Sequence, residues 1–177
     1  MKIGIAGCGG IGSNVAMHLV RAGIRNFKII DFDKIEDSNL NRQFYFKDQI
    51  GEYKSLTLNK NLLRINDQIN IETITEKITE KNVTNFFQDC NIIIEAFDKK
   101  EYKKLLIENY KNKIIISANG IGGRDLENIK VKKYGNLNVV GDFQSDIKDY
   151  KTYSTKVMFV ATIMANIVLD YMDRKAE

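Results

Sequence analysis

A glycine-rich segment near the start of the chain has the composition of a phosphate-binding loop. The residues Gly-Cys-Gly-Gly-Ile-Gly occupy positions 7–12, directly after a short apolar run. Gly7 permits a tight turn, and Gly9 and Gly10 let a phosphate approach the backbone. Gly12 lets the following helix pack closely on the strand, and the first N–H groups of that helix can face anionic oxygens. We therefore predict a nucleotide site here, the alternative being a glycine turn that binds nothing.

An acid follows at the spacing expected for ribose recognition. Asp31 lies nineteen residues after Gly12, at the end of the next predicted strand. An acid in this position accepts hydrogen bonds from ribose hydroxyls. The spacing fits NAD as readily as ATP, so it does not identify the nucleotide. Asp33 is interpreted as a turn residue.

The segment after Asp31 carries groups that suit chemistry on a triphosphate. Asn39 and Arg42 lie in a long polar loop, and Lys54 follows at the opening of the next predicted helix. Two cations near the phosphates would stabilise the negative charge that builds up during phosphoryl or nucleotidyl transfer. The alternatives are a surface salt bridge for Arg42 and a solvated helix lysine for Lys54.

A second acid lies just beyond the fourth predicted strand. Asp98 falls at the carboxyl edge, where open parallel sheets bind ligands. One carboxylate together with ATP phosphates is a usual way to hold magnesium. An N-cap on the following helix fits the sequence equally well.

Alternating apolar strands and amphipathic helices predict an α/β fold over a single domain, residues 1–177. We expect a Rossmann-like, doubly wound, mainly parallel sheet with a short antiparallel extension near the C-terminus. The predicted strands are 2–6, 27–31, 70–75, 91–96, 113–118, 128–134 and 137–141. The predicted helices run from Ile11 to Gly23, over 52–66, over 79–88, up to about Tyr110, and over 155–172, with a long loop at 32–50.

Composition excludes several classes of function. The chain has 177 residues, 44% hydrophobic and 28% charged, which is typical of a globular domain. Its net charge of +4 comes from scattered lysines without a basic stripe, so nucleic-acid binding is not expected. The apolar run Val157–Leu169 is too short to span a bilayer. Because a strand is predicted at the N-terminus, no signal peptide is expected. The two cysteines, Cys8 and Cys90, lie far apart in sequence and fit buried thiols in a reducing cytoplasm. No CxxC pair is present, so a structural zinc site is not expected.

These residues, in this order, resemble the ThiF/MoeB family, the bacterial relatives of the ubiquitin-activating enzymes. The resemblance rests on GCGGIGSN, IIDFDKIEDSNLNRQF, GEYK and EAFD, spread over roughly residues 2–100. The SNLNRQ segment is much more specific than the glycine loop. Weaker similarity continues over 113–145, where Gly141-Asp142-Phe143 resembles a short ThiF-like subgroup associated with thiamine synthesis.

The resemblance implies an enzyme, an adenylyltransferase that uses ATP and Mg²⁺. Its substrate would be the C-terminal Gly-Gly carboxylate of a small ubiquitin-like sulfur carrier of the ThiS type. Asp98 would bind the magnesium. The carboxylate would attack the α-phosphate, pyrophosphate would leave, and alignment and charge stabilisation would supply most of the catalysis.

The resemblance also assigns the remaining site residues. Gly10 would lie against the phosphates and Asp31 would hold the ribose. Arg42 and Lys54 would neutralise the phosphates, with Asn39 beside them. Together with Asp98, the two cations form the expected catalytic set.

The chain departs from the family pattern in four places. It lacks the paired CxxC zinc ligands and the thiol-transfer cysteine of larger members, so we expect adenylation with no zinc and no thioester or persulfide step. Because a strand is predicted directly after Met1, we expect no N-terminal helix of the kind that supplies an arginine across the dimer in many relatives, and the crossover segment at 142–156 is short. Lys99 follows Asp98 where the family usually has asparagine.

A homodimer is expected from the apolar last helix and from family habit. Two alternative functions remain open at this point. One is adenylation of another carboxylate, such as that on a modified tRNA base. The other is a dinucleotide-binding domain without catalysis.

Overall fold

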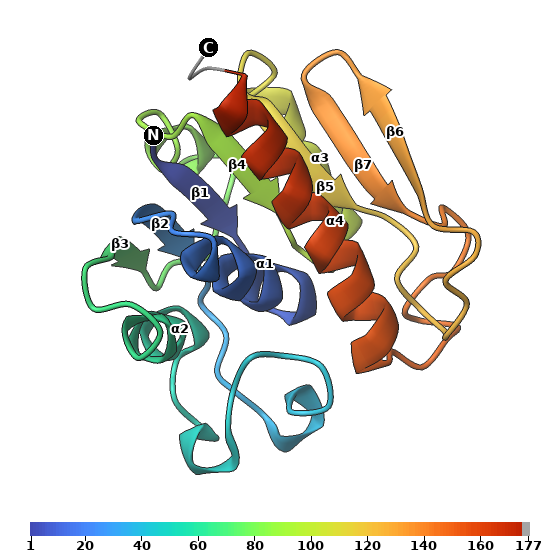
Figure 1. Cartoon of the computed structure of the whole chain (residues 1–177), viewed down its shortest axis with the longest axis horizontal. Coiled ribbons are helices and arrows are strands. Elements are labelled where there is room, and N and C mark those ends of the chain that lie inside the picture. Colours follow the sequence, from blue (N-terminus) through green and yellow to red (C-terminus); the bar gives the residue numbers. More distant parts are fainter. Residues whose placement is uncertain (175–177) are drawn as a thin grey trace.

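Within residues 1–174, which the computed structural model describes, one mixed sheet forms the centre of the molecule (Figure 1). Its strand order is β3-β2-β1-β4-β5-β7-β6, and all neighbours are parallel except the antiparallel pair β6 and β7. The strands are β1 Ile3–Ala6, β2 Asn26–Ile30, β3 Asn70–Ile74, β4 Ile92–Glu95, β5 Ile114–Ala118, β6 Lys130–Tyr134 and β7 Leu137–Gly141. The predicted Rossmann-like sheet with its antiparallel extension is confirmed.

Helices cover both faces of the sheet, as the fully buried strand β1 and the buried isoleucine runs of β4 and β5 require. Helices α1 (Gly10–Arg21), α2 (Lys54–Leu63) and α4 (Ser154–Asp173) share one apolar core with one face. Helix α3 (Lys100–Asn109) and the segment before β4 form a second core on the other face. The carboxyl ends of the parallel strands are thereby left free of helix and open to a ligand.

The apolar run Val157–Leu169 lies within the longer helix α4, which by length and composition is the one helix in the described chain that could cross a membrane, so the expectation that this segment is too short is corrected. Its inner side packs along α1, as Figure 1 shows, and buries residues that include Val157, Val160, Met164 and Val168. Lys156 lies fully buried on the same helix and forms an ion pair with Asp142. This packing is typical of the core helix of a folded domain.

The segment before β4 departs from expectation. A helix was predicted over 79–88, but only a single 3-10 turn forms there, at Val83–Asn85. The side chain of Asn82 accepts from the backbone N–H of Thr79 at 2.7 Å and donates to the carbonyl of Lys77. Such side-chain-to-backbone bonds replace the helical hydrogen bonds, so the predicted helix is wrong.

The loop after β2 is also more ordered than its lack of periodicity suggests. It contains two short 3-10 turns, at Asp37–Asn39 and Lys47–Gln49. The following helix is shorter than the predicted 52–66 and occupies Lys54–Leu63. These turns fix the positions of the polar residues in the predicted site.

Candidate active site at the carboxyl edge of the sheet

A cavity of about 950 Å³ lies along the carboxyl ends of the strands. The structure brings eight of the nine predicted site residues to its walls: Gly7, Gly9, Gly10, Asp31, Asn39, Arg42, Lys54 and Asp98. Gly12 lies behind the loop instead, where any side chain would collide with the carbonyl oxygen of Gly7. Gly12 therefore serves the close packing of helix on strand.

The glycine loop leaves backbone N–H groups available to an anion. Gly7 has φ +94°, and its N–H donates to the carbonyl of Ile30 at 2.9 Å. Gly9 is the N-cap residue of α1, and no side chain caps the helix. The first turn of α1 contains no acidic residue. Unsatisfied N–H groups and the helix dipole together favour a phosphate at this position.

Asp31 joins the end of β2 to the glycine loop. Its Oδ2 accepts from the backbone N–H of Cys8 at 2.6 Å, and its Oδ1 accepts from that of Asp33 at 2.8 Å. Burial raises the pKa of Asp31, and the two backbone hydrogen bonds oppose that effect. Each oxygen keeps acceptor capacity toward the cavity, as ribose recognition requires.

Arg42 lies beside the glycine loop. A β-carbon on Gly10 would be 3.5 Å from Arg42 Cγ. Its Nη1 donates to the carbonyl of Ser38 at 3.0 Å and to Oδ1 of Asn41 at 2.8 Å. The guanidinium of Arg42 forms no ion pair within residues 1–174, so the alternative of a surface salt bridge is ruled out for this part of the chain. Burial lowers the pKa of Arg42. A cation without a carboxylate partner is suited to a phosphate.

Two amide side chains hold this part of the cavity wall. Asn39 is buried, and its Oδ1 accepts from the backbone N–H of Glu36 at 3.1 Å. Asn14, on α1, donates to the carbonyls of Gly10 and Arg42 at 2.6 and 2.9 Å. Asn14 thereby fastens the arginine segment to the glycine loop. Sequence reasoning missed it, because its partner lies 28 residues further along the chain.

One buried polar atom on the cavity wall has no partner. The side-chain oxygen of Gln43, next to Arg42, receives no hydrogen bond from the described chain. A buried acceptor without a donor is costly, so a ligand or water donor is expected there.

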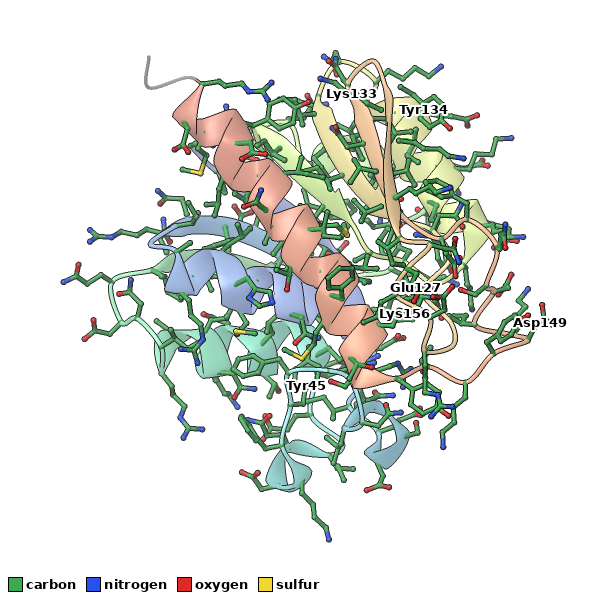
Figure 2. The ribbon with its side chains drawn as sticks, turned by 45° about the vertical axis from the view of Figure 1, so that its right-hand side comes forward. Tyr45, Glu127, Lys133, Tyr134, Asp149 and Lys156 are labelled. Atoms are coloured by element: carbon green, nitrogen blue, oxygen red, sulfur yellow. The ribbon has the colours of Figure 1, made fainter. Side chains whose placement is uncertain are left out.

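Lys54 is buried at the opening of α2, so the solvated helix lysine is ruled out. Its Nζ lies 3.3 Å from Oδ2 of Asp33. No turn forms at Asp33, so its interpretation as a turn residue is wrong, and its side chain forms an ion pair with Lys54. Tyr45 donates to the carbonyls of Cys8 and Lys54, at 2.9 and 3.2 Å. This tyrosine, labelled in Figure 2, ties α2 to the glycine loop and was not foreseen.

Asp98 is exposed and lines the cavity from the β4–α3 connection. It does not cap α3: Lys99 is the N-cap residue, and no side chain bonds the first turn. No ion pair or hydrogen bond to Asp98 exists in the described chain, which leaves both oxygens free. One free carboxylate beside a phosphate site fits magnesium, which commonly binds one protein carboxylate together with substrate phosphates. Residues 1–174 contain no group of three or more side chains that could bind a metal ion without a substrate.

An ion pair between buried Glu95 and partly exposed Lys103 lies next to the Asp98 loop and was also missed. Glu95, the last residue of β4, is fully buried. Its Oε2 accepts from Lys103 Nζ at 2.7 Å and from the Ser117 hydroxyl at 2.5 Å, and its Oε1 accepts from the N–H of Phe97 at 2.8 Å. The sequence feature that could have indicated this ion pair is the single carboxylate, Glu95, at the end of the isoleucine run of β4.

Neither thiol is placed for chemistry. Cys8 and Cys90 are both fully buried. Burial, and then the charge of Asp31, raises the pKa of Cys8 well above its ordinary value, and burial raises that of Cys90 to about 12. Because the thiolate is the nucleophile, burial disfavours reaction at both sulfurs.

Comparison with known proteins assigns the chain to a family. Residues 1–176 match the ThiF family, so the chain belongs to that family. It is 33% identical over 106 residues to the molybdopterin-synthase adenylyltransferase of Haemophilus influenzae, covering 59% of this chain and 44% of that protein. It is 30% identical over 95 residues to the sulfur carrier protein adenylyltransferase of Thermus thermophilus, covering 53% of this chain and 35% of that protein.

A solved structure agrees over almost the whole fold. The tRNA N6-threonylcarbamoyladenosine dehydratase of E. coli in complex with AMP superposes with a TM-score of 0.90 at 21% identity, covering 99% of this chain and 87% of that one. The same protein in complex with ATP gives a TM-score of 0.88. The curated relatives are longer, and this chain matches less than half the length of each of the two named above.

Proposed function

We propose that the chain is an ATP-dependent adenylyltransferase that activates the C-terminal Gly-Gly carboxylate of a small ubiquitin-like sulfur carrier. The observation that carries this proposal is the position of Arg42 beside Gly10, without a carboxylate partner in the described chain. Lys54 approaches the same cavity from α2. The two curated relatives described above are both named adenylyltransferases, which supports the same function.

In this reaction the site residues act by position and charge. The N-terminus of α1 and Gly10 hold the triphosphate, and Asp31 accepts the ribose hydroxyls. The carrier carboxylate attacks the α-phosphorus, an acyl–adenylate bond forms, and the bond to pyrophosphate breaks. Arg42 and Lys54 stabilise the charge that accumulates on the phosphate oxygens. Asp98 would hold Mg²⁺, which would supply positive charge beside the phosphates.

We extend the proposal to a cytoplasmic carrier of the ThiS type in thiamine synthesis and to a homodimer. The dimer is supported by the outer side of α4, where Phe159 is 42% exposed and Ile163 is partly buried. Sedimentation of wild type and Phe159→Asp tests this point: a dimer that dissociates in the variant supports it, and a wild-type monomer overturns it.

Exchange of labelled pyrophosphate into ATP tests the activity. The protein, ATP·Mg²⁺ and a panel of Gly-Gly-tailed carriers, ThiS-type and molybdopterin-synthase-type, should support exchange with at least one carrier. Each carrier lacking its last two glycines is the matched control, because it keeps the folded surface and removes the reacting end. No exchange with any carrier would exclude the proposed activity.

A modified tRNA base is the second candidate for the reacting carboxylate. Its support is the fold likeness to the E. coli tRNA dehydratase, which at 21% identity shows the fold alone. A salt-sensitive shift of tRNA in a native gel, with tRNA-dependent ATP consumption, would favour it. Tight NAD(H) binding without ATP binding would instead favour a non-catalytic dinucleotide-binding domain.

A further inference from the structure

Three segments of the cavity wall meet at one buried carboxylate, that of Glu95. Glu95 is the last residue of β4, and its side chain is fully buried. Its Oε1 accepts from the backbone N–H of Phe97 at 2.8 Å. Its Oε2 accepts from Lys103 Nζ at 2.7 Å and from the Ser117 hydroxyl at 2.5 Å. The β4–α3 connection (residues 96–99), helix α3 and strand β5 are therefore joined through a single side chain (Figure 1).

The hydrogen bonds to Glu95 lie on both sides of Asp98 along the chain. Phe97 directly precedes Asp98, and Lys103 follows it in helix α3. The rings of Phe97 and Tyr102 also meet across this segment, with their centroids 5.7 Å apart. The Asp98 side chain itself has no hydrogen bond or ion pair within residues 1–174. The position of its carboxylate is therefore set by how Glu95 holds the chain on either side.

The same connection lies against the glycine loop. A β-carbon on Gly7 would be 2.9 Å from the carbonyl oxygen of Ala96 and 3.2 Å from Cδ1 of Phe97. The N–H of Ala96 donates to the carbonyl of Ala6, the residue before Gly7, at 2.9 Å. Gly7 and Asp98 both line the cavity. A shift of the β4–α3 connection would therefore change where the Asp98 carboxylate stands relative to a phosphate at the glycine loop.

A buried charge at the end of β4 is not explained by stability alone. The strand reads Ile-Ile-Ile-Glu, and a carboxylate taken out of water loses hydration that an ion pair replaces only in part. An apolar side chain at this position would avoid that loss. The Glu95 carboxylate instead accepts three hydrogen bonds, each from a different segment, and a fully satisfied buried group of this kind makes its surroundings rigid.

We propose that Glu95 is a positioning residue: it holds Asp98 where the carboxylate can share a divalent cation with the phosphates of a nucleotide at the glycine loop. Glu95 does not line the cavity, so it acts through Phe97 and Lys103, which do. This inference rests on the metal role given to Asp98 in the proposed function, and it deepens that role by naming the residue on which it depends. Changing a residue that orients a metal ligand typically costs about 10- to 100-fold in metal affinity.

Binding of Mn²⁺ tests the inference without turnover. The protein is loaded with α,β-methylene-ATP, which cannot release pyrophosphate, and Mn²⁺ is titrated while electron paramagnetic resonance follows the free ion. Glu95→Gln is the informative variant, because it removes the charge and keeps the shape of the side chain. Lys28→Met is the matched control, because Lys28 also pairs with carboxylates, those of Glu72 and Asp89, and lies outside the cavity wall. Nucleotide binding without metal and thermal melting are measured for each variant.

We expect Glu95→Gln to weaken Mn²⁺ binding by roughly tenfold and to leave metal-free nucleotide binding as in wild type. Lys28→Met should leave both affinities unchanged. Asp98→Asn should weaken Mn²⁺ binding as well. Adding Glu95→Gln to Asp98→Asn should cause no further loss, because both changes act through the same carboxylate.

Wild-type Mn²⁺ affinity in Glu95→Gln, alongside a loss in Asp98→Asn, overturns the inference alone. A parallel loss of metal-free nucleotide binding in Glu95→Gln also overturns it, because that result assigns Glu95 a general structural role. If Glu95→Gln melts below the assay temperature, the double variant Glu95→Gln, Lys103→Met takes its place, since it leaves no unpaired charge.

Wild-type Mn²⁺ affinity in Asp98→Asn overturns the metal role of Asp98 together with the inference. If the Mn²⁺ results are as expected but no carrier supports pyrophosphate exchange, the proposed adenylation of a carrier is overturned and the positioning role of Glu95 is supported.

Discussion

The side chain of Arg42 runs alongside Gly10, with its Cγ 3.5 Å from the place a β-carbon on Gly10 would occupy. The SNLNRQ segment and the glycine loop, some thirty residues apart in sequence, thus form one surface. Asn14 fastens the two through hydrogen bonds to the carbonyls of both Gly10 and Arg42. The aliphatic stem of an arginine beside the N-terminus of a helix brings a cation to a surface that already favours the oxygens of a triphosphate.

Replacing Arg42 should remove charge stabilisation from the transition state. We expect Arg42→Ala to lower kcat for pyrophosphate exchange by about a hundredfold, the effect of losing one transition-state donor. Arg42→Lys should recover only part of the rate, because an ammonium lacks the planar donor pair. Arg25→Ala, an exposed arginine away from the cavity, is the matched control. An unchanged kcat in Arg42→Ala would show that the guanidinium does not act on the phosphates.

Asp98 should govern the magnesium requirement. With Asp98→Asn we expect the Mg²⁺ concentration for half-maximal exchange to rise by about tenfold or more, because the amide supplies a weaker ligand. Titration of Mg²⁺ at saturating ATP measures this. Asp48→Asn changes an exposed acid outside the cavity and should leave the titration as in wild type. Coincident curves for Asp98→Asn and Asp48→Asn would exclude Asp98 as the metal ligand.

Removing only one partner of the Asp142–Lys156 ion pair should destabilise the fold strongly. Lys156→Met leaves the Asp142 carboxylate buried and unpaired, and we expect it to lower the free energy of unfolding by about 3–5 kcal/mol. The double variant Asp142→Asn, Lys156→Met should lose less, since no charge remains buried. Urea denaturation measures both, with the exposed Lys148→Met as control. Equal losses in the single and double variants would mean that packing, and not charge, sets the cost.

A second set of charges should make stability fall in acid. Lys2 and Lys28 each pair with both Glu72 and Asp89, at 2.6 to 3.2 Å. The hydrogen bond from Lys2, and then that from Lys28, holds the pKa of Asp89 well below its ordinary value, and Lys2 also lowers that of Glu72. An acid with a depressed pKa stabilises the fold above its unfolded pKa and loses that contribution as pH falls through the folded value.

The free energy of unfolding should therefore be level at neutral pH and decline below about pH 4, where the unfolded carboxylates begin to bind protons. Urea midpoints across that range measure it. Asp89→Asn should be less stable at neutral pH and should show a flatter acid limb. An acid limb of the same steepness in the variant would assign the decline to other carboxylates.

Local signals made most of the fold and part of the site predictable. Isoleucine runs mark β4 and β5 because a doubly covered parallel sheet buries both faces of its strands. Asp31 follows from its spacing, because strand, loop and helix lengths fix where β2 ends. Tyr45 and Glu95 were missed, since each acts through partners distant in sequence. The helix predicted at 79–88 does not form, because the Asn82 side chain makes hydrogen bonds to the backbone. The spacing of apolar residues carries no information about such bonds.

Strand β1 is hydrogen-bonded on one side to β2 and on the other to β4, so its two neighbours enter the sheet some sixty residues apart along the chain. A nascent polypeptide synthesised only as far as β3 contains the entire glycine loop. The edge of β1 that pairs with β4 in the folded protein is still unpaired at this stage. Such an intermediate would recruit other chains at that edge. We therefore expect this sheet to be completed only after β4, which begins at Ile92, has been synthesised. Chaperones that bind the nascent chain should matter most before that point.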